Sequence, residues 1–482
     1  MAKHFGTDGI RNKAECFTAE FLGKVVLGLV NYANQCGIAH PKILIGGDTR
    51  ESSEWILADL ASALETIGIE YGSVEVLPTP GINCVFVPMG FDFAIDVTAS
   101  HNPYTDNGIK IFERNDLNVP AGSSDIVPTG RKLSPEGATL IEQAIDGNQT
   151  ITPISTEPIE SLHEDALDRY LTHLIDYTTR IQSPGIESPA NPQPLAGLKV
   201  ALDCANGSTS VVGGQVFERL GADVTVFNRN ANYGQDINAG TGSTHLDHIS
   251  EIVKQGDFDF GAAFDGDGDR CLLVDSSGET ISGDQIIAIF ANYLSLDKLV
   301  VTVMANQGLY DWAKKSSVEL VVTDVGDTNV FLAMRREHIL LGGEESGHII
   351  LPREPMGDGM LVALFMGKII ATTGQSLAEL ASIMPRFPQI TTNVPANDTA
   401  KSALRSVTAK DSSTPSDDLS AELQQVLRQY QEDLALSDGR LLVRPSGTEA
   451  LVRITIWGKE LSHIENISRD LSAKLTSIFD KF

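Results

Sequence analysis

The feature that most constrains the fold of this chain is an internal repeat of three segments built to one plan. Each segment begins with a β-branched run, continues through a helical pattern to another such run, and ends in a polar loop containing glycine. The segments begin at PKILIGGDTR, LKVALDCANGS and KLVVTVMANQG, and they end in FAIDVTASHNP, FGAAFDGDGDR and ILLGGEESGH. Such alternation indicates βαβ units and mainly parallel sheets, whose carboxyl ends are where ligands bind. A generic likeness among α/β units is the alternative explanation.

The repeat and the length of 482 residues together predict four domains, because one hydrophobic core does not grow to this size. After Phe387 the pattern changes to strands and long helices around a polar stretch, which is typical of a smaller α+β domain. We expect three similar α/β domains with mixed, mainly parallel sheets and a smaller C-terminal α+β domain around a central cleft. The expected boundaries are 1–150, 160–282, 283–388 and 389–482, with insertions or linkers at 115–131 and 183–194.

Composition excludes several classes of protein. The net charge of −28 repels nucleic acid and anionic membranes, although it is also explained by solubility alone. No apolar run is long enough for a membrane span, and the N-terminus lacks the apolar core of a signal peptide. The five cysteines show no CxxC spacing and fit reduced thiols. We expect a cytoplasmic protein with a small-molecule substrate and no nucleic-acid or membrane partner; a homodimer is compatible with the sequence.

The loop DGDGDR, residues 265–270, carries the strongest chemical signal. Its three aspartates alternate with glycines, so the backbone can bring the carboxylates together, and a bound cation would relieve their repulsion. Oxygen ligands favour Mg²⁺ over zinc or copper. An EF-hand is excluded because Arg270 and Ser276 stand where that motif needs glycine and glutamate. A solvated acidic turn remains the alternative.

The loop TASHNP, residues 98–103, places Ser100 on a tight turn after a strand. A serine needs a base or a cation to act as a nucleophile, and His101 and Lys110 are near in sequence. Taken by itself, such a turn serine is more often structural.

Two further loops offer polar groups suited to a phosphosugar. GEESGH, residues 343–348, presents Glu344, Ser346 and His348, which suit sugar hydroxyls and a general base, or form an exposed polar loop. RPSGTE, residues 444–449, resembles an anion cradle of arginine, hydroxyl and glycine groups, unless Arg444 pairs with a local carboxylate such as Glu449. Near the N-terminus, Arg11 and Arg50 could neutralise a phosphate or serve as ion-pair residues.

A phosphosugar mutase would use all four loops in one reaction. The O6 and O1 oxygens of a hexose are too far apart for direct phosphate transfer, so an enzyme residue must carry the phosphate. Such a reaction needs a carrier, a cation, a sugar grip that accepts two orientations and a cradle for the second phosphate.

The motifs together resemble the α-D-phosphohexomutase superfamily, in the family order from residue 5 to 453. The resemblance implies a hexose 1,6-bisphosphate as intermediate and activator. It implies one Mg²⁺ held by the phosphate of Ser100 and by Asp265, Asp267 and Asp269. The catalytic residues implied are Ser100, Arg11, Lys110 and His348, and the substrate-binding residues implied are Glu344, Ser346, Arg444, Ser446, Gly447, Thr448 and Arg453.

Within the superfamily, the runs FGTDGIR, SHNPYTDNGIKIF and DCANG are most similar to the phosphoglucosamine mutase branch. That resemblance implies interconversion of glucosamine 6-phosphate and glucosamine 1-phosphate for cell-wall precursors. The chain departs from the branch at Asn12, Thr328 and Glu345. A phosphoglucomutase or phosphomannomutase is therefore the alternative enzyme, and a phosphosugar sensor or a hydrolase is the alternative outside the mutases.

Overall fold

The computed structural model describes residues 4–6, 8–116, 129–151, 161–182, 191–408, 417–446 and 449–482. The chain forms two compact units. The first consists of Met1–Thr302 and Val318–Ile383, and the second of Val303–Ser317 and Met384–Phe482. Among the described helices, none is long and apolar enough to cross a membrane. The domain boundaries expected from the sequence remain a prediction.

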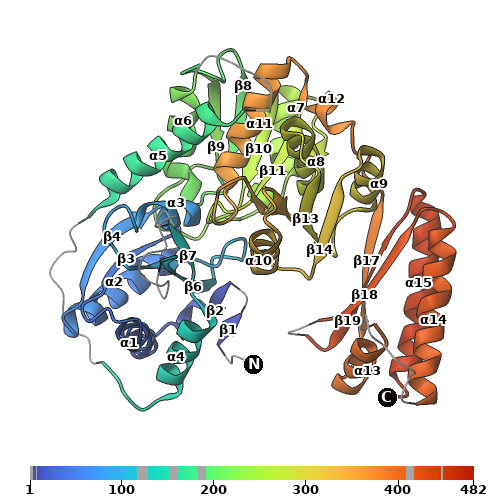
Figure 1. Cartoon of the computed structure of the whole chain (residues 1–482), viewed down its shortest axis with the longest axis horizontal. Helices are drawn as coiled ribbons and strands as arrows, with labels where there is room; N and C mark the ends of the chain where they lie inside the picture. Colours follow the sequence, from blue (N-terminus) through green and yellow to red (C-terminus); the bar gives the residue numbers. More distant parts are fainter. Residues whose placement is uncertain are drawn as a thin grey trace. The chain divides into compact units, whose positions relative to one another are not determined.

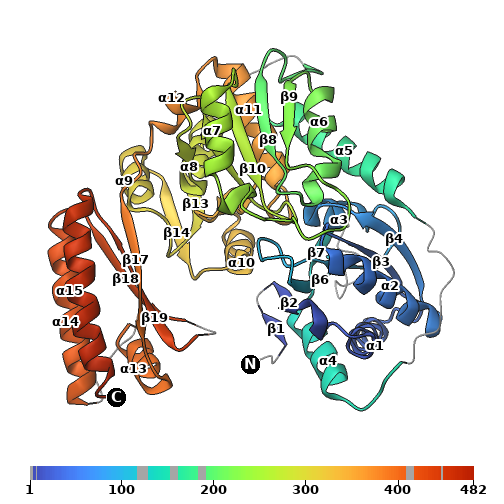
Figure 2. The same ribbon diagram turned by 180° about the vertical axis from the view of Figure 1, so that it is seen from behind.

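The threefold repeat is visible in the order and pairing of the strands (Figures 1 and 2). All its strands belong to the first unit. In each repeat three strands pair in parallel, with the first strand in the centre, and a fourth strand then pairs antiparallel with the third. The first repeat contains β3 (Lys42–Gly47), α2 (Glu51–Thr66), β4 (Glu70–Val76), α3 (Thr79–Val85), β5 (Phe93–Val97) and β6 (Asp106–Arg114). The expectation of three similar α/β domains with mixed sheets is confirmed.

The second and third repeats follow the same order of elements. The second contains β8 (Lys199–Asp203), α6 (Gly213–Arg219), β9 (Asp223–Phe227), α7 (Asp247–Gln255), β10 (Phe260–Phe264) and β11 (Cys271–Asp275). The third contains β13 (Lys298–Thr302), α9 (Gln307–Ser316), β14 (Glu319–Thr323), α10 (Asp327–Glu337), β15 (Gly342–Gly343) and β16 (Ile349–Ile350).

Short antiparallel strands extend the sheets beyond their parallel centres. The first sheet has the order β1-β2-β6-β5-β3-β4, with β7 also paired to β6. The added strands are β1 (Phe5–Gly6), β2 (Gly9–Lys13), β7 (Gly130–Lys132) and β12 (Thr280–Ile281). Strand β7 includes the end of the segment expected to be an insertion, whereas residues 117–128 and 183–190 lie outside the described residues.

Helices on the first sheet bury its main core. Alternate side chains of β3 and β5, such as Ile43, Ile45 and Ile95, pack against apolar residues of three helices. These helices are α1 (Ala19–Gln35), α2 and α4 (Pro135–Asp146). Helix α1 begins at Thr18, whose side chain accepts a hydrogen bond from the Phe21 N–H. This layer holds the strands whose ends carry the polar loops.

A long helix, α5 (His163–Arg180), packs against α11 (Gly359–Thr373). Tyr170 donates a hydrogen bond to Asp358, which caps the start of α11. At the other end of α5, Lys368 Nζ donates to the carbonyl oxygens of Thr178 and Thr179, at 2.8 and 3.1 Å. The buried ammonium therefore satisfies carbonyl groups that the helix itself leaves without partners.

The second unit contains a three-stranded antiparallel sheet of order β17-β19-β18, packed against long helices. Its elements are β17 (Gln389–Pro395), α13 (Asp398–Thr408), α14 (Asp418–Ala435), β18 (Arg440–Pro445), β19 (Leu451–Trp457) and α15 (Leu461–Phe479). Arg440 attaches α9 to this sheet, because it donates to the carbonyl oxygen of Val303 at 3.0 Å and stacks on the rings of Tyr310 and Trp457. The expected α+β character is therefore present. The remaining helices, α8 (Gly283–Leu294) and α12 (Leu377–Ala381), belong to the first unit.

Candidate active site

The three polar loops of the repeats occupy equivalent positions, each between the third parallel strand and the antiparallel strand that follows it. The loop that carries Ser100 joins β5 to β6, the DGDGDR loop joins β10 to β11, and the GEESGH loop joins β15 to β16. A carboxyl strand end is where an α/β sheet places its ligand-binding groups. Contacts between these loops, described below, bring them into one site.

Ser100 lies buried and in contact with the aspartate loop. Its Oγ donates a hydrogen bond to Asp265 Oδ2 at 2.7 Å, and only 1% of its surface is exposed. Its φ of 53° lies in the left-handed region, which non-glycine residues rarely adopt and which is common at functional sites. The Ser100 N–H donates to Thr98 Oγ1 at 2.9 Å and so helps to hold the turn. The hydroxyl is therefore fixed in one direction.

The three carboxylates of Asp265, Asp267 and Asp269 converge, with one oxygen from each lying within 4.8 Å of the others. All three residues are buried. Within the part of the chain that the structure describes, Asp267 Oδ1 and Asp269 Oδ1 have no hydrogen-bond partner, although such buried atoms ordinarily have one. An all-oxygen set with two such atoms fits a hard divalent cation. The group could hold a metal ion.

Glycine is required where the aspartate loop meets the serine loop. A Cβ on Gly266 would lie 2.8 Å from the Ser100 carbonyl oxygen and 2.7 Å from a side-chain carbon of Ile237. Both distances are shorter than a real Cβ allows, so only glycine permits this approach. The alternation of aspartate and glycine thus serves the close packing of the two loops as well as the convergence of the carboxylates.

Lys110, on β6, reaches the same carboxylates. Its Nζ donates to Asp267 Oδ2 at 2.7 Å and to Asp269 Oδ2 at 2.9 Å, and it lies 3.2 Å from Asp8 Oδ2. Burial by itself would lower the pKa of Lys110, but the surrounding carboxylates outweigh burial and hold that pKa well above its usual value. The ammonium therefore carries a positive charge beside the aspartates.

His348, at the end of the GEESGH loop, faces the site from the third repeat. Its Nδ1 lies 3.7 Å from Asp269 Oδ1, and its Nε2 lies 3.8 Å from Asp327 Oδ2. Burial opposes the charged imidazolium, but these carboxylates outweigh it and raise the pKa of His348. The Gly357 N–H lies 3.2 Å from Nε2. Packing of the ring against this glycine fixes its orientation.

Sequence reasoning missed Lys132 and its two partners. Lys132 Nζ donates to the carboxylates of Asp8 and Asp327. Asp8 also pairs with Lys110, and Asp327 lies near His348, so Lys132 connects these two groups. All five residues line a cavity of about 1900 Å³. Lys132 and Asp8 lie 124 positions apart in the sequence, so their meeting depends on tertiary packing.

The two N-terminal arginines differ in their surroundings. Arg11 Nη2 lies 3.2 Å from Asp8 Oδ2, and 30% of the side chain is exposed, so the guanidinium can reach a ligand. Arg50 is completely buried, and its donors are directed at the serine loop. His101 lies beside Ser100, but burial and the guanidinium groups of Arg270 and Arg11 lower the pKa of His101 to about 4.

The sugar-loop carboxylates lie at the edge of this group. Glu344 Oε1 accepts a hydrogen bond from the Gly326 N–H at 3.0 Å, which ties the loop to the start of α10. Ser346 is exposed at the tip of the loop. Neither side chain contacts the aspartates in the hydrogen bonds of the described residues, so these two remain predicted sugar ligands.

The predicted phosphate cradle lies in the second unit. Arg444 on β18 is paired directly with Arg453 on β19, an arrangement of like charges that favours an anion between them. Arg453 Nη2 lies 2.7 Å from Glu449 Oε2, so the local carboxylate pairs with Arg453. Ser446 Oγ accepts a hydrogen bond from the Glu449 N–H at 3.2 Å. Gly447 and Thr448 lie outside the described residues.

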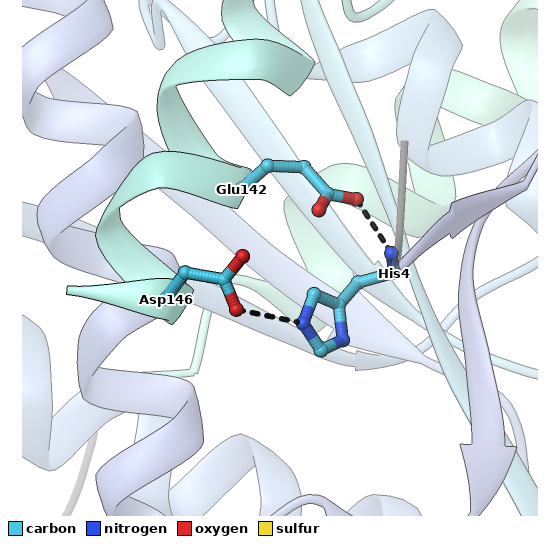
Figure 3. A group of neighbouring side chains, drawn as sticks. All are labelled: His4, Glu142 and Asp146. Atoms are coloured by element: carbon cyan, nitrogen blue, oxygen red, sulfur yellow. Dashed lines mark hydrogen bonds and ion pairs between the residues drawn. The ribbon is translucent and has the colours of Figure 1, made fainter. Parts of the chain in front are cut away.

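A second group of side chains of the kinds that bind metals, His4, Glu142 and Asp146, makes structural contacts. Glu142 Oε1 accepts a hydrogen bond from the backbone N–H of His4 at 2.6 Å (Figure 3). It also accepts one from the Phe5 N–H at 2.7 Å. His4 Nε2 lies 3.6 Å from Asp146 Oδ1, and 53% of the Asp146 side chain is exposed. The group therefore attaches the N-terminal strand to helix α4.

Four family models of phosphoglucomutase/phosphomannomutase match the chain. They describe the alpha/beta/alpha domain I at residues 2–147, domain II at 170–278, domain III at 282–387 and the C-terminal domain at 399–474. Together they span most of the chain.

Three curated relatives, each called phosphoglucosamine mutase, match over nearly their whole length. The relative from Desulforamulus reducens is 38% identical and covers 97% of this chain and 98% of its own. The relative from Bacillus velezensis is 36% identical and covers 94% of this chain and 94% of its own. The relative from Clostridium tetani is 35% identical and covers 98% of this chain and 98% of its own.

Solved structures share the fold. A phosphoglucomutase/phosphomannomutase family protein from Burkholderia thailandensis has a TM-score of 0.70 at 20% identity and covers 99% of this chain and 98% of its own. The N-acetylphosphoglucosamine mutase of Aspergillus fumigatus, solved with GlcNAc-6P and magnesium, has a TM-score of 0.59 at 17% identity and covers 99% and 96%. The resemblance read from the sequence is thus confirmed, and the chain belongs to the phosphoglucomutase/phosphomannomutase family.

Proposed function

We propose that this protein is a phosphoglucosamine mutase, which interconverts glucosamine 6-phosphate and glucosamine 1-phosphate through a phosphorylated Ser100. The observation that carries the reaction is the 2.7 Å hydrogen bond from the buried Ser100 Oγ to Asp265, inside a cluster of carboxylates bordered by Lys110. The choice of sugar is supported by the full-length relatives of 34–38% identity that bear this activity in their names.

The reaction consists of two displacements at phosphorus. First, the O1 hydroxyl of glucosamine 6-phosphate attacks the phosphorus carried by Ser100: the O1–P bond forms, the P–Oγ bond breaks, and the hydroxyl proton passes to a base. After the 1,6-bisphosphate reorients, Ser100 Oγ attacks the phosphorus on O6. The Oγ–P bond forms, the O6–P bond breaks, and O6 takes up a proton, which restores the phosphoserine and releases glucosamine 1-phosphate.

The aspartate loop would hold one Mg²⁺ through Asp265, Asp267 and Asp269, together with the phosphate of Ser100. Two buried carboxylate oxygens that find no hydrogen-bond partner among the described residues support this assignment. When bound, the ion supplies positive charge that offsets the charge on the transferring phosphoryl group. A hexose 1,6-bisphosphate would also prime the unphosphorylated enzyme.

The neighbouring residues are assigned by what they touch. Lys110 would balance the charge around the phosphoryl group because its ammonium is held 2.7 Å from Asp267. His348, which lies beside Asp269, would transfer a proton to or from the sugar hydroxyl. Arg11, which is partly exposed, would bind the phosphate of the incoming substrate. Glu344 and Ser346 would bind sugar hydroxyls.

In the second unit, the arginine pair across β18 and β19 would hold the phosphate that does not react. Its members are Arg444 and Arg453, and Ser446, Gly447 and Thr448 complete the assigned cradle.

The proposed substrate is tested by comparing kcat/KM for glucosamine, glucose and mannose 6-phosphates. We expect glucosamine 6-phosphate to exceed both by at least about 10-fold. Ser100→Ala should abolish turnover of all three, whereas Ser376→Ala, which removes the cap of helix α12, should not. Equal turnover of glucose 6-phosphate would contradict the assigned sugar, and mutase activity in Ser100→Ala would contradict the phosphoserine route.

The same assay separates the other classes. A hydrolase would release inorganic phosphate in step with substrate loss, and a sensor would bind the sugar phosphate without turning it over. The burial of Ser100 argues against hydrolysis, because a phosphorus attached to a buried Oγ is shielded from bulk water.

A further inference from the structure

Arg50 lies directly between strand β3 and helix α2 and is completely buried. Its Nε donates to Asp48 Oδ2 at 2.9 Å. Asp48 also accepts hydrogen bonds from Ser53 Oγ at 2.8 Å and Thr98 Oγ1 at 2.6 Å. The carboxylate is thereby fixed from several sides, and it fixes the plane of the guanidinium in turn.

The other donors of Arg50 are directed at backbone carbonyl oxygens of the loop that carries Ser100. Nη1 donates to Pro103 and Asp106, at 2.5 and 3.2 Å. Nη2 donates to Ser100 and Asn102, at 2.8 and 2.9 Å. With the bond from Nε, all five N–H donors of the guanidinium are used. No donor remains for a substrate phosphate.

A residue of the second repeat holds two of the same oxygens. Asn238 Nδ2 donates to the carbonyl oxygens of Ser100 and Asn102, at 2.9 and 3.2 Å. Asn238 is itself buried, with 8% of its surface exposed. The Ser100 carbonyl oxygen is therefore held by a guanidinium and an amide from different parts of the first unit.

These contacts act on a strained turn. A left-handed φ at a residue with a side chain is strained and persists only where the surroundings enforce it. Ser100 has this conformation, with φ of 53°. If the turn relaxed, the peptide plane would rotate and Oγ would leave its position 2.7 Å from Asp265.

We propose that Arg50 is a positioning residue, which, together with Asn238, holds the carbonyl oxygens of the Ser100 turn and so aims Oγ at the reacting phosphorus. This inference rests on the proposed role of Ser100 as phosphate carrier. It rejects the simpler role of Arg50 as a phosphate ligand, because the side chain is buried and its donors are all used. We call residues 98–106, Arg50 and Asn238 the serine clamp.

The test compares Arg50→Lys and Asn238→Ala with wild type. Lysine keeps the charge, but its single nitrogen cannot span four carbonyl oxygens and a carboxylate. The enzyme carrying a radiolabelled phosphate on Ser100 is mixed with saturating unlabelled glucosamine 6-phosphate, and passage of the label to the sugar phosphate is followed by rapid quench. We expect the rate constant of transfer to fall about 10- to 100-fold, with KM changed less than about 3-fold because no substrate contact is lost.

Lys368→Met is the matched control. Lys368 is also a buried cation that donates to backbone carbonyl oxygens, but these belong to the end of helix α5 and not to the clamp. This variant should lower the melting temperature and leave the transfer rate within about 2-fold of wild type. A general loss of stability therefore cannot imitate the expected result.

Hydrogen–deuterium exchange supplies the second readout. In both clamp variants, exchange should rise in the peptide covering 98–106 and remain unchanged in the peptides of helix α5. If Arg50→Lys does not fold, the transfer rate and the exchange of residues 98–106 in Asn238→Ala test the proposal. Unchanged exchange together with an unchanged transfer rate would overturn the proposal, as would a rise in KM without a change in rate. Failure of wild type to carry phosphate on Ser100 would refute the proposed function, while exchange in 98–106 would still test the clamp.

Discussion

The Ser100 site of the first unit and the arginine pair of the second unit are both proposed to bind phosphate, but they are built differently. In the first, Lys110 and Asp267 are ion-paired with 4% and 1% of their side chains exposed. In the second, Arg453 and Glu449 pair with 39% and 53% exposed. A buried charge must keep its partner, because losing it leaves an uncompensated charge, whereas an exposed pair contributes little.

This difference matches two different tasks. A reacting phosphoryl group needs groups that are already oriented before the reaction begins. A phosphate that is only held must also be released, and partly exposed arginines permit exchange with water and ions. The predictions below test whether the buried region affects the chemical step and the exposed region affects binding.

The largest effect is expected in the buried region. Asp267→Asn removes one of the converging carboxylates and a partner of Lys110, so kcat should fall about 100- to 1000-fold. Binding of Mg²⁺, measured by calorimetry, should weaken in parallel.

Asp275→Asn is the control for that prediction. Asp275 is a buried aspartate at the other end of β11, where it accepts hydrogen bonds from the N–H groups of Ser277 and Glu279. This variant should retain kcat and Mg²⁺ binding. A loss of Mg²⁺ binding equal to that of Asp267→Asn would contradict the assigned metal ligands.

An intermediate effect is expected in the exposed cradle. Arg444→Met removes charge-assisted hydrogen bonds to the phosphate that does not react, so KM should rise about 10- to 100-fold while kcat changes less. Steady-state kinetics provide the measurement. Arg469→Met, on the exposed face of α15, is the control and should keep the wild-type KM. A fall in kcat at constant KM would place Arg444 in the chemical step and remove the contrast between the regions.

A smaller effect concerns stability rather than activity. Burial raises the pKa of Asp358 to about 7, whereas hydrogen bonds lower the pKa values of the exposed Asp438 and Asp470 in the second unit. The folded protein binds the Asp358 proton more tightly than the unfolded chain does. Its contribution to stability is therefore present below about pH 4 and is lost as pH rises to about 7, by at most about 4 kcal/mol.

Asp358→Asn removes this titration and should keep the hydrogen bond from the Leu361 N–H. The melting temperature of the variant relative to wild type should therefore rise between pH 5 and pH 8. A difference that does not change with pH would show that Asp358 has an ordinary pKa.

Much of the fold was predictable because it is periodic in the sequence. The threefold repeat located the loops of Ser100, Asp265 and His348 at equivalent strand ends, where the structure has them. The short antiparallel strands were not predicted, because strands of two or three residues such as β1 and β7 are too short to show alternation. The association of α9 with the C-terminal sheet depends on Arg440, and no periodic pattern signals it.

The site was predictable where motifs are contiguous and less so where residues meet only in space. Lys132 lies 124 positions from Asp8 and 195 positions from Asp327 along the chain, and nothing local in the sequence indicates either contact. Arg50 shows a second limit of prediction from sequence. An arginine at this position suggested a phosphate ligand or an ion-pair residue, and only the directions of its five N–H donors in the structure indicate a positioning role.

The central claim, that Ser100 carries the phosphate, is tested most directly by intact mass spectrometry. After incubation with radiolabelled glucose 1,6-bisphosphate and Mg²⁺, wild type should gain one phosphate, about 80 Da. On addition of unlabelled glucosamine 6-phosphate, the label should pass to the sugar phosphate while the protein keeps one phosphate. Ser100→Ala should show neither change. A phosphate gained by Ser100→Ala, or a label that does not pass from wild type to the sugar phosphate, would contradict the account.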